Sequence, residues 1–206
     1  MTPLPLPSGS DRISGCNSTG NHDQTPRPSG SDRISGCNST GNHDHTGAAV
    51  IGVDDPRAPD VRALLDRHLA FALETSPPEH AFALDVDGLL DAAITFCSCR
   101  LSGELLGIGA LKELDPAHGE IKSMHTAAAA RGRGVGRAML THLLNVAGAR
   151  GYARVSLETG TMAEFAPARA LYASAGFVFC PPFAAYAASP DNCFMTLTFA
   201  QSPTPM

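Results

Sequence analysis

The chain has 206 residues, of which 43% are hydrophobic, and its formal net charge is -5 at pH 7. A chain of this length can bury one sizeable core but is too short for two domains of ordinary size. Its acidic balance argues against broad attraction to nucleic acid or to an anionic membrane. No apolar run approaches the roughly 20 residues that span a bilayer, and the N-terminus lacks the pattern of a secretory signal, so we expect a cytoplasmic protein.

The first 47 residues contain a duplicated 17-residue segment. Residues 7–23 read PSGSDRISGCNSTGNHD, and residues 28–44 read the same. Each copy has one Ile and one Cys among Gly, Ser, Asn and Asp, which is too little apolar surface to stack one repeat on the next. We therefore predict a disordered tail over residues 1–47, one domain over residues 48–200 and a flexible C-terminus over residues 201–206.

The first half of the domain mixes strand and helix patterns. An apolar run over residues 48–53 predicts a strand, and apolar residues at helical spacing from Val61 to Ala72 predict a helix that ends before Ser76. Strand patterns over residues 92–100 and 104–112 are joined by a short link with a glycine, which predicts a hairpin. A further strand is expected over residues 120–126.

The second half alternates more regularly. A helix pattern starts near Gly136 and ends at Gly151. A strand over residues 153–157, a helix over residues 167–175 and paired strands near residues 177–180 and 194–199 complete an alternating α/β domain.

The cysteines outside the duplicated segment do not predict a metal site. Cys97 and Cys99 are two residues apart in an expected strand and would share one face. This spacing is tighter than the gaps usual for zinc, and no second close pair completes a site. Buried free thiols are the expected outcome.

The segment Arg131-Gly132-Arg133-Gly134-Val135-Gly136 stands between an expected strand and an expected helix. The first N–H groups of a helix have no intrahelical partner, and glycines let that backbone approach an anion closely. Arg131, Arg133 and Arg137 add positive charge in an otherwise acidic chain. These features favour a diphosphate ligand, with a ligand-free arginine-glycine turn as the alternative. The segment lacks the Gly-Lys-Ser/Thr ending of nucleoside triphosphatase loops, and no Gly-x-Gly-x-x-Gly motif of dinucleotide-binding proteins follows the first strand.

Two motifs carry a resemblance to a known family. The glycine-rich segment resembles the Gln/Arg-x-x-Gly-x-Gly/Ala pyrophosphate loop of the GNAT superfamily of acetyl-CoA-dependent N-acetyltransferases. Residues 170–177, ALYASAGF, resemble its later Leu-Tyr-x-x-x-Gly-Phe signature, in the same order and separation. Segments such as GEIKSM and SLETG are similar to a bacterial YsnE-like branch. The resemblance covers roughly residues 48–199.

The resemblance implies an α/β (α+β) fold: a mixed, mostly antiparallel central sheet with helices on both faces, splayed between its fourth and fifth strands. Acetyl-CoA would lie in the splay without any metal. Its pantetheine would follow the strand backbone, and its diphosphate would bind backbone amides of the loop. The implied cofactor-binding residues are Met124, His125, Thr126, Arg131, Gly132, Arg133, Gly134, Val135, Gly136 and Arg137.

Acetyl transfer to an amine requires an unprotonated amine, a donor to the oxyanion and a proton for the thiolate. The resemblance implies that Tyr172 protonates the sulfur, the alternative being a helix tyrosine packed on the sheet. A strand N–H near Met124 or His125 would face the oxyanion, most plausibly at a bulge.

For the base, Glu120 stands eleven residues before Arg131, where histone-type members of the superfamily place their catalytic glutamate. Lys122 shares its strand face and could instead form an ordinary ion pair with it. Glu158, His125 and a water chain are rival bases.

One position departs from the family pattern. Many members carry Asn seven residues before the tyrosine, where this chain has Phe165. The cofactor contacts of that loop are therefore not carried over.

The sequence thus predicts an N-acetyltransferase that acts on a small-molecule or peptide amine through a direct ternary complex, as a monomer or homodimer. Rival interpretations are a catalytically silent CoA-binding regulatory module and an anion-binding interaction domain.

Overall fold

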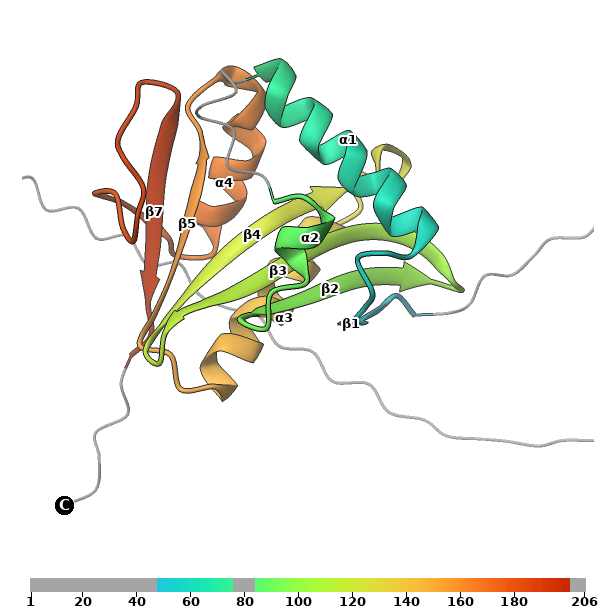
Figure 1. The fold of residues 1–206 in the computed structure, drawn as a ribbon, viewed down its shortest axis with the longest axis horizontal. Helices are drawn as coiled ribbons and strands as arrows, with labels where there is room; N and C mark the ends of the chain where they lie inside the picture. The colour runs from blue at the N-terminus through green and yellow to red at the C-terminus, as the bar shows by residue number, and fades with distance from the viewer. Residues whose placement is uncertain (1–47, 76–83, 201–206) are drawn as a thin grey trace, which may run out of the picture. The chain divides into compact units, whose positions relative to one another are not determined.

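The computed structural model describes residues 48–75 and 84–200. The tail predicted over residues 1–47 and the C-terminus predicted over residues 201–206 lie outside this range. The described residues form one sheet with helices on both faces (Figure 1). The elements are β1 (Val50–Val53), α1 (Pro59–Thr75), α2 (Val86–Leu89), β2 (Ile94–Leu101), β3 (Glu104–Asp115), β4 (His118–Thr126), η2 (Ala128–Ala130), α3 (Val135–Ala149), β5 (Arg154–Gly160), η3 (Ala163–Phe165), α4 (Ala166–Ser174), β6 (Val178–Cys180) and β7 (Asn192–Thr198).

The strands lie in the order β1-β2-β3-β4-β5-β7-β6, and β4 with β5 is the parallel pair among antiparallel neighbours. Pairing of β4 with β5 ends at Ile121 and Leu157, although β4 continues to Thr126 and β5 to Gly160. The two strands therefore part toward their C-terminal ends. This confirms the predicted mixed sheet and its splay between the fourth and fifth strands.

The predicted hairpin between β2 and β3 is confirmed, and its turn explains the glycine. Ser102 and Gly103 have φ angles of 49° and 89°. A two-residue turn with positive φ at both positions matches the twist of antiparallel strands, and glycine adopts such angles without strain.

The central strands of the sheet are buried on both faces. Cys97 and Cys99 pack with α3 and α4 in one core, whereas Phe96 and Ile108 pack with α1 and α2 in the other. Side chains alternate across a strand, so β2 must be apolar at successive positions to fill both cores. The two cysteines are free and buried, as expected.

Some element bounds differ from the sequence prediction. Strand β4 begins at His118, two residues before the strand predicted over residues 120–126, because His118 pairs with Asp115 of β3 and Arg154 of β5. Helix α2 was not predicted, since four residues are too few for a periodic pattern; the Asp85 carboxylate caps it by accepting from the Gly88 N–H at 2.8 Å. Within the described ranges, no helix is long and apolar enough to cross a membrane.

Candidate active site

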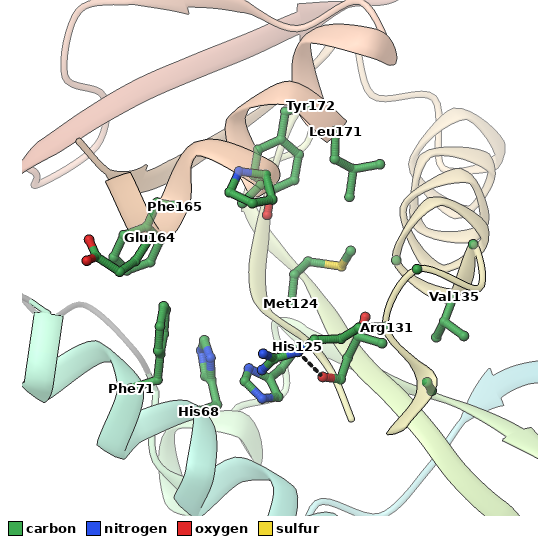
Figure 2. A pocket seen from close by; sticks show the side chains of 17 residues that line it. His68, Phe71, Met124, His125, Arg131, Val135, Glu164, Phe165, Leu171 and Tyr172 are labelled. Atoms are coloured by element: carbon green, nitrogen blue, oxygen red, sulfur yellow. Dashed lines mark hydrogen bonds between the residues drawn. The ribbon is translucent and has the colours of Figure 1, made fainter. Parts of the chain in front are cut away.

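A cavity of about 410 Å³ opens where β4 leaves β5. Its walls come from α1, the end of β4, the glycine loop, η3 and α4, and Figure 2 shows their side chains converging. A largely apolar cavity of this size with a few polar groups is typical of a cofactor or substrate site.

The glycine loop, residues 131–136, forms one end of the cavity. Gly132 and Gly134 have φ angles of 72° and 82°, which other residues rarely adopt. The Ala138 N–H donates to the Gly134 carbonyl at 2.9 Å. Among the described residues, no backbone carbonyl accepts from the amides of residues 132–137. These N–H groups at the positive end of α3 are therefore available to an anion.

Most of the predicted cofactor residues meet at this cavity. Arg131 Nε donates to the Thr126 carbonyl at 3.4 Å, which ties the loop to the end of β4 (Figure 2). Arg133 and Arg137 lie outside the lining. The predicted residues that line it are Met124, His125, Thr126, Arg131, Gly132, Gly134, Val135 and Gly136.

Strand β4 carries a bulge just beyond the last residue that pairs with β5. Lys122 faces Ala110 and His125 faces Ile108, so three steps along β4 match two along β3. Ser123 has a φ angle of 52° at this point. A bulge interrupts the ladder and leaves one residue unpaired. The bulge predicted for the oxyanion donor near Met124 is therefore present in β4.

Tyr172 reaches from α4 into the cavity (Figure 2). The residue is 7% exposed, and its ring lies 5.9 Å from that of Phe177. Burial, together with the nearby Glu158 carboxylate, raises the pKa of the Tyr172 hydroxyl. The hydroxyl therefore keeps its proton at neutral pH and is available as a hydrogen-bond donor in the cavity.

Glu120 is buried on β4 and has two polar partners. Lys122 Nζ lies 3.2 Å from its Oε1, and the Tyr186 hydroxyl donates to the same oxygen at 2.5 Å. Lys122 Nζ also donates to the Tyr186 oxygen at 2.6 Å. The ion pair left open by the sequence is thus present, with a tyrosine 66 residues away that no sequence pattern connected to it.

Glu158 lies on β5 just beyond the last pair with β4, where it is partly buried. Within the described part of the chain, no side chain forms a hydrogen bond or ion pair with its carboxylate. Burial raises the pKa of Glu158 to about 7, and the charge of Glu120 adds to this shift while Lys122 opposes it. An unpaired carboxyl group with a pKa near neutrality is suited to proton transfer.

Two histidines meet at the wall of the cavity that α1 provides. The rings of His68 and His125 have centroids 5.3 Å apart (Figure 2). Burial lowers the pKa of each imidazole to about 4, and nearby Lys122 adds to the shift of His68. Both rings are therefore neutral at pH 7, and neither adds charge to the cavity.

Phe165 forms an apolar wall of the cavity. Its ring lies 5.1 Å from that of Phe71 on α1. Arg169 fixes the segment that carries it by donating to the carbonyls of Gly160 and Met162 at 2.6 and 2.9 Å. Position 165 therefore shapes the cavity by packing rather than by polar contact.

The sheet opens between a parallel strand pair, free loop amides lie at the opening, and a buried tyrosine faces it. Together these features define the class of coenzyme A-dependent N-acyltransferases. The chain belongs to the acetyltransferase (GNAT) family, whose model matches residues 60–177.

Relatives and solved structures agree with this assignment. The chain is 49% identical to the uncharacterized N-acetyltransferase YsnE of Bacillus subtilis over 146 residues, which cover 71% of this chain and 97% of that protein. A crystal structure of a putative acyl-CoA N-acyltransferase from Klebsiella pneumoniae superposes with a TM-score of 0.63 at 26% identity, covering 75% and 99% of the two chains. The yncA structure from Salmonella typhimurium, which contains acetyl-CoA, superposes with a TM-score of 0.57 at 19% identity over 77% and 98%.

Proposed function

We propose that this protein transfers the acetyl group of acetyl-CoA to a primary amine of a small molecule or peptide, in a direct ternary complex. The observation that carries the proposal is the row of free amides at residues 132–137, which stands at one end of the cavity that Tyr172 lines. An anion bound to the loop and a group near Tyr172 can thus belong to one extended molecule.

The residues present fit acetyl-CoA. The loop amides would hold the diphosphate with help from Arg131, and the edge of β4 from Met124 to Thr126 offers backbone groups to the pantetheine amides. Apolar walls from Leu171 and Val135 suit the pantetheine chain. Acetyl-CoA, when bound, supplies the thioester that is attacked and the thiolate that leaves.

Three groups of this chain would then perform the transfer. Glu158 removes a proton from the acceptor ammonium so that the nitrogen lone pair can form the new C–N bond. A backbone N–H at the β4 bulge near Met124 donates to the carbonyl oxygen as negative charge develops on it. Tyr172 gives its proton to the sulfur as the C–S bond breaks, and the second proton that the nitrogen loses in becoming an amide restores the Tyr172 hydroxyl.

We assign the base to Glu158 rather than to Glu120. Glu120 Oε1 already accepts from Lys122 and Tyr186, whereas Glu158 has no such partner among the described residues. Glu120 is then a structural or positioning residue. Glu158→Gln should reduce turnover by two or more orders of magnitude, the usual range for a general base.

Acetyl-CoA turnover against a broad panel of amines, amino acids and peptides tests the proposal. Acetylated product should be read by mass, because the free thiols of the protein would react with a thiol dye. Acetylated product that depends on Tyr172 is the expected result. Tight CoA binding with a blank panel would favour the silent CoA-binding module, and equal competition by phosphate or nucleotides would favour an anion-binding interaction domain.

A further inference from the structure

Three charged side chains follow one another on one face of β4 and β5. In the parallel register Glu120 faces Ser156. Two residues further along each strand, Lys122 and Glu158 occupy the next equivalent positions on the same face, just past the point where the strands part. The order of charges is therefore Glu120, Lys122, Glu158, with the ammonium between two carboxylates.

The ammonium of Lys122 is held by the first carboxylate. Its Nζ lies 3.2 Å from Glu120 Oε1 and 2.6 Å from the Tyr186 hydroxyl oxygen. The side chains of Lys122 and Glu120 are only 9% and 3% exposed. Tyr186 closes the arrangement, because its hydroxyl donates to Glu120 while it accepts from Lys122. Charges shielded from water in this way act strongly on their neighbours.

We propose that Glu120, Lys122 and Tyr186 form a positioning group that sets the proton affinity of Glu158, by keeping the Lys122 ammonium on Glu120 and away from Glu158. This inference rests on the proposed function, because it concerns the base of that reaction. A Glu158 carboxylate paired directly with Lys122 would be held ionised and would be a weak base. With the Lys122 charge balanced by Glu120, Glu158 retains the affinity of a base that works near neutral pH.

Burial is the largest cause of the raised pKa of Glu158, so the positioning group protects that shift rather than producing it. Other ionisable groups also face this region. The groups that interact with Glu158 electrostatically are Glu120 and Lys122 on β4, Tyr172 on α4, Tyr186 after β6, and Cys193 on β7. Lys122 and Glu120 form the ion pair beside Glu158, so they are the residues to vary.

The test is a titration of the Glu158 carboxyl group by ¹³C NMR in the full chain without acceptor, with assignment from Glu158→Gln. Glu120→Gln removes a negative neighbour and releases Lys122, so it should lower the apparent pKa of Glu158 by about one unit. Lys122→Met removes the positive neighbour and leaves Glu120 unbalanced, so it should raise that pKa by about one unit. The double variant, which removes both charges, should return to within a few tenths of a unit of wild type.

The inference is supported if the pKa of Glu158 shifts in opposite directions in the two single variants and returns nearly to its wild-type value in the double variant. An ion pair that serves only to hold the fold would leave the pKa of Glu158 unchanged in both single variants. That outcome, or shifts in the same direction, overturns the inference. Should one single variant fail to fold, the direction in the other single variant decides. If Glu158→Gln retains turnover, Glu158 is not the base and this inference is wrong. The proposed acetyltransferase function is not contradicted by that result.

Discussion

Gly160 lies against the ring of Phe165, so closely that a Cβ on Gly160 would be 2.4 Å from Cδ2 of Phe165. No ordinary contact is that short, and the ring cannot give way easily because Phe71 packs against it. Gly160 at the end of β5 and Phe165 in η3 therefore depend on each other for their packing.

Gly160→Ala should displace the Phe165 ring and reshape the cavity. Overpacking of this kind costs about 1–3 kcal/mol of unfolding free energy, and affinity for CoA should fall as well. The matched control is Gly148→Ala in α3, where a new Cβ meets nothing within 4 Å. This substitution should stabilise the helix by about 0.5–1 kcal/mol, because alanine is a better helix former than glycine. Chemical denaturation and calorimetry measure both effects; a Gly160→Ala variant as stable as wild type would contradict the packing argument.

Tyr172→Phe separates chemistry from binding. Loss of the hydroxyl removes the proton for the leaving thiolate but leaves the ring in place, so kcat should fall about 10²-fold or more while the Kd for CoA changes little. Tyr152→Phe is the control, because the Tyr152 hydroxyl donates to Glu113 at 2.9 Å and does not line the cavity. Turnover in Tyr172→Phe equal to that in Tyr152→Phe would remove Tyr172 from the mechanism.

Gly134 and Gly103 form a matched pair for the loop. Both have positive φ, at 82° and 89°, and a Cβ on either would meet nothing within 4 Å. Alanine at either position should cost about 1–2 kcal/mol of stability through backbone strain alone. Affinity for CoA, measured by calorimetry, should fall in Gly134→Ala and stay unchanged in Gly103→Ala, because only the first moves the loop amides. Equal affinity of the two variants for CoA would contradict the proposal that the loop amides bind it.

Glu158 also makes stability depend on pH. The pKa of Glu158 is raised in the folded protein to about 7, so between about pH 4.5 and 7 the folded state binds more protons than the unfolded state. This contribution to stability is full below the unfolded pKa and is lost as the pH rises through 7. Glu158→Gln abolishes that loss.

The difference in unfolding free energy between Glu158→Gln and wild type should therefore change in favour of the variant by on the order of 2–3 kcal/mol from pH 4.5 to pH 8. Denaturant unfolding at a series of pH values in that window measures the difference. A difference that stays constant with pH would mean that Glu158 titrates normally in the folded protein.

Several parts of the fold and site could be predicted from sequence because each depends on local chemistry. The glycines at 132 and 134, the helix that follows them and the tyrosine motif at Tyr172 are contiguous patterns. By contrast, the contact of Tyr186 with Glu120 joins segments 66 residues apart, and the burial of Glu158 depends on where two strands part. The bulge at Ser123 leaves no mark in the alternation of side chains, so only the pairing of β3 with β4 reveals it.

The central claim is that the amides of residues 132–137 hold the diphosphate of coenzyme A, and titration calorimetry on the full chain tests it most directly. The comparison uses CoA and pantetheine, which shares the thiol-bearing arm but lacks the diphosphate. We expect CoA to bind at least about 100-fold more tightly than pantetheine, since charge-assisted hydrogen bonds to several amides are lost without the phosphates. Equal affinity for the two ligands, or no heat of binding with CoA, would contradict the account.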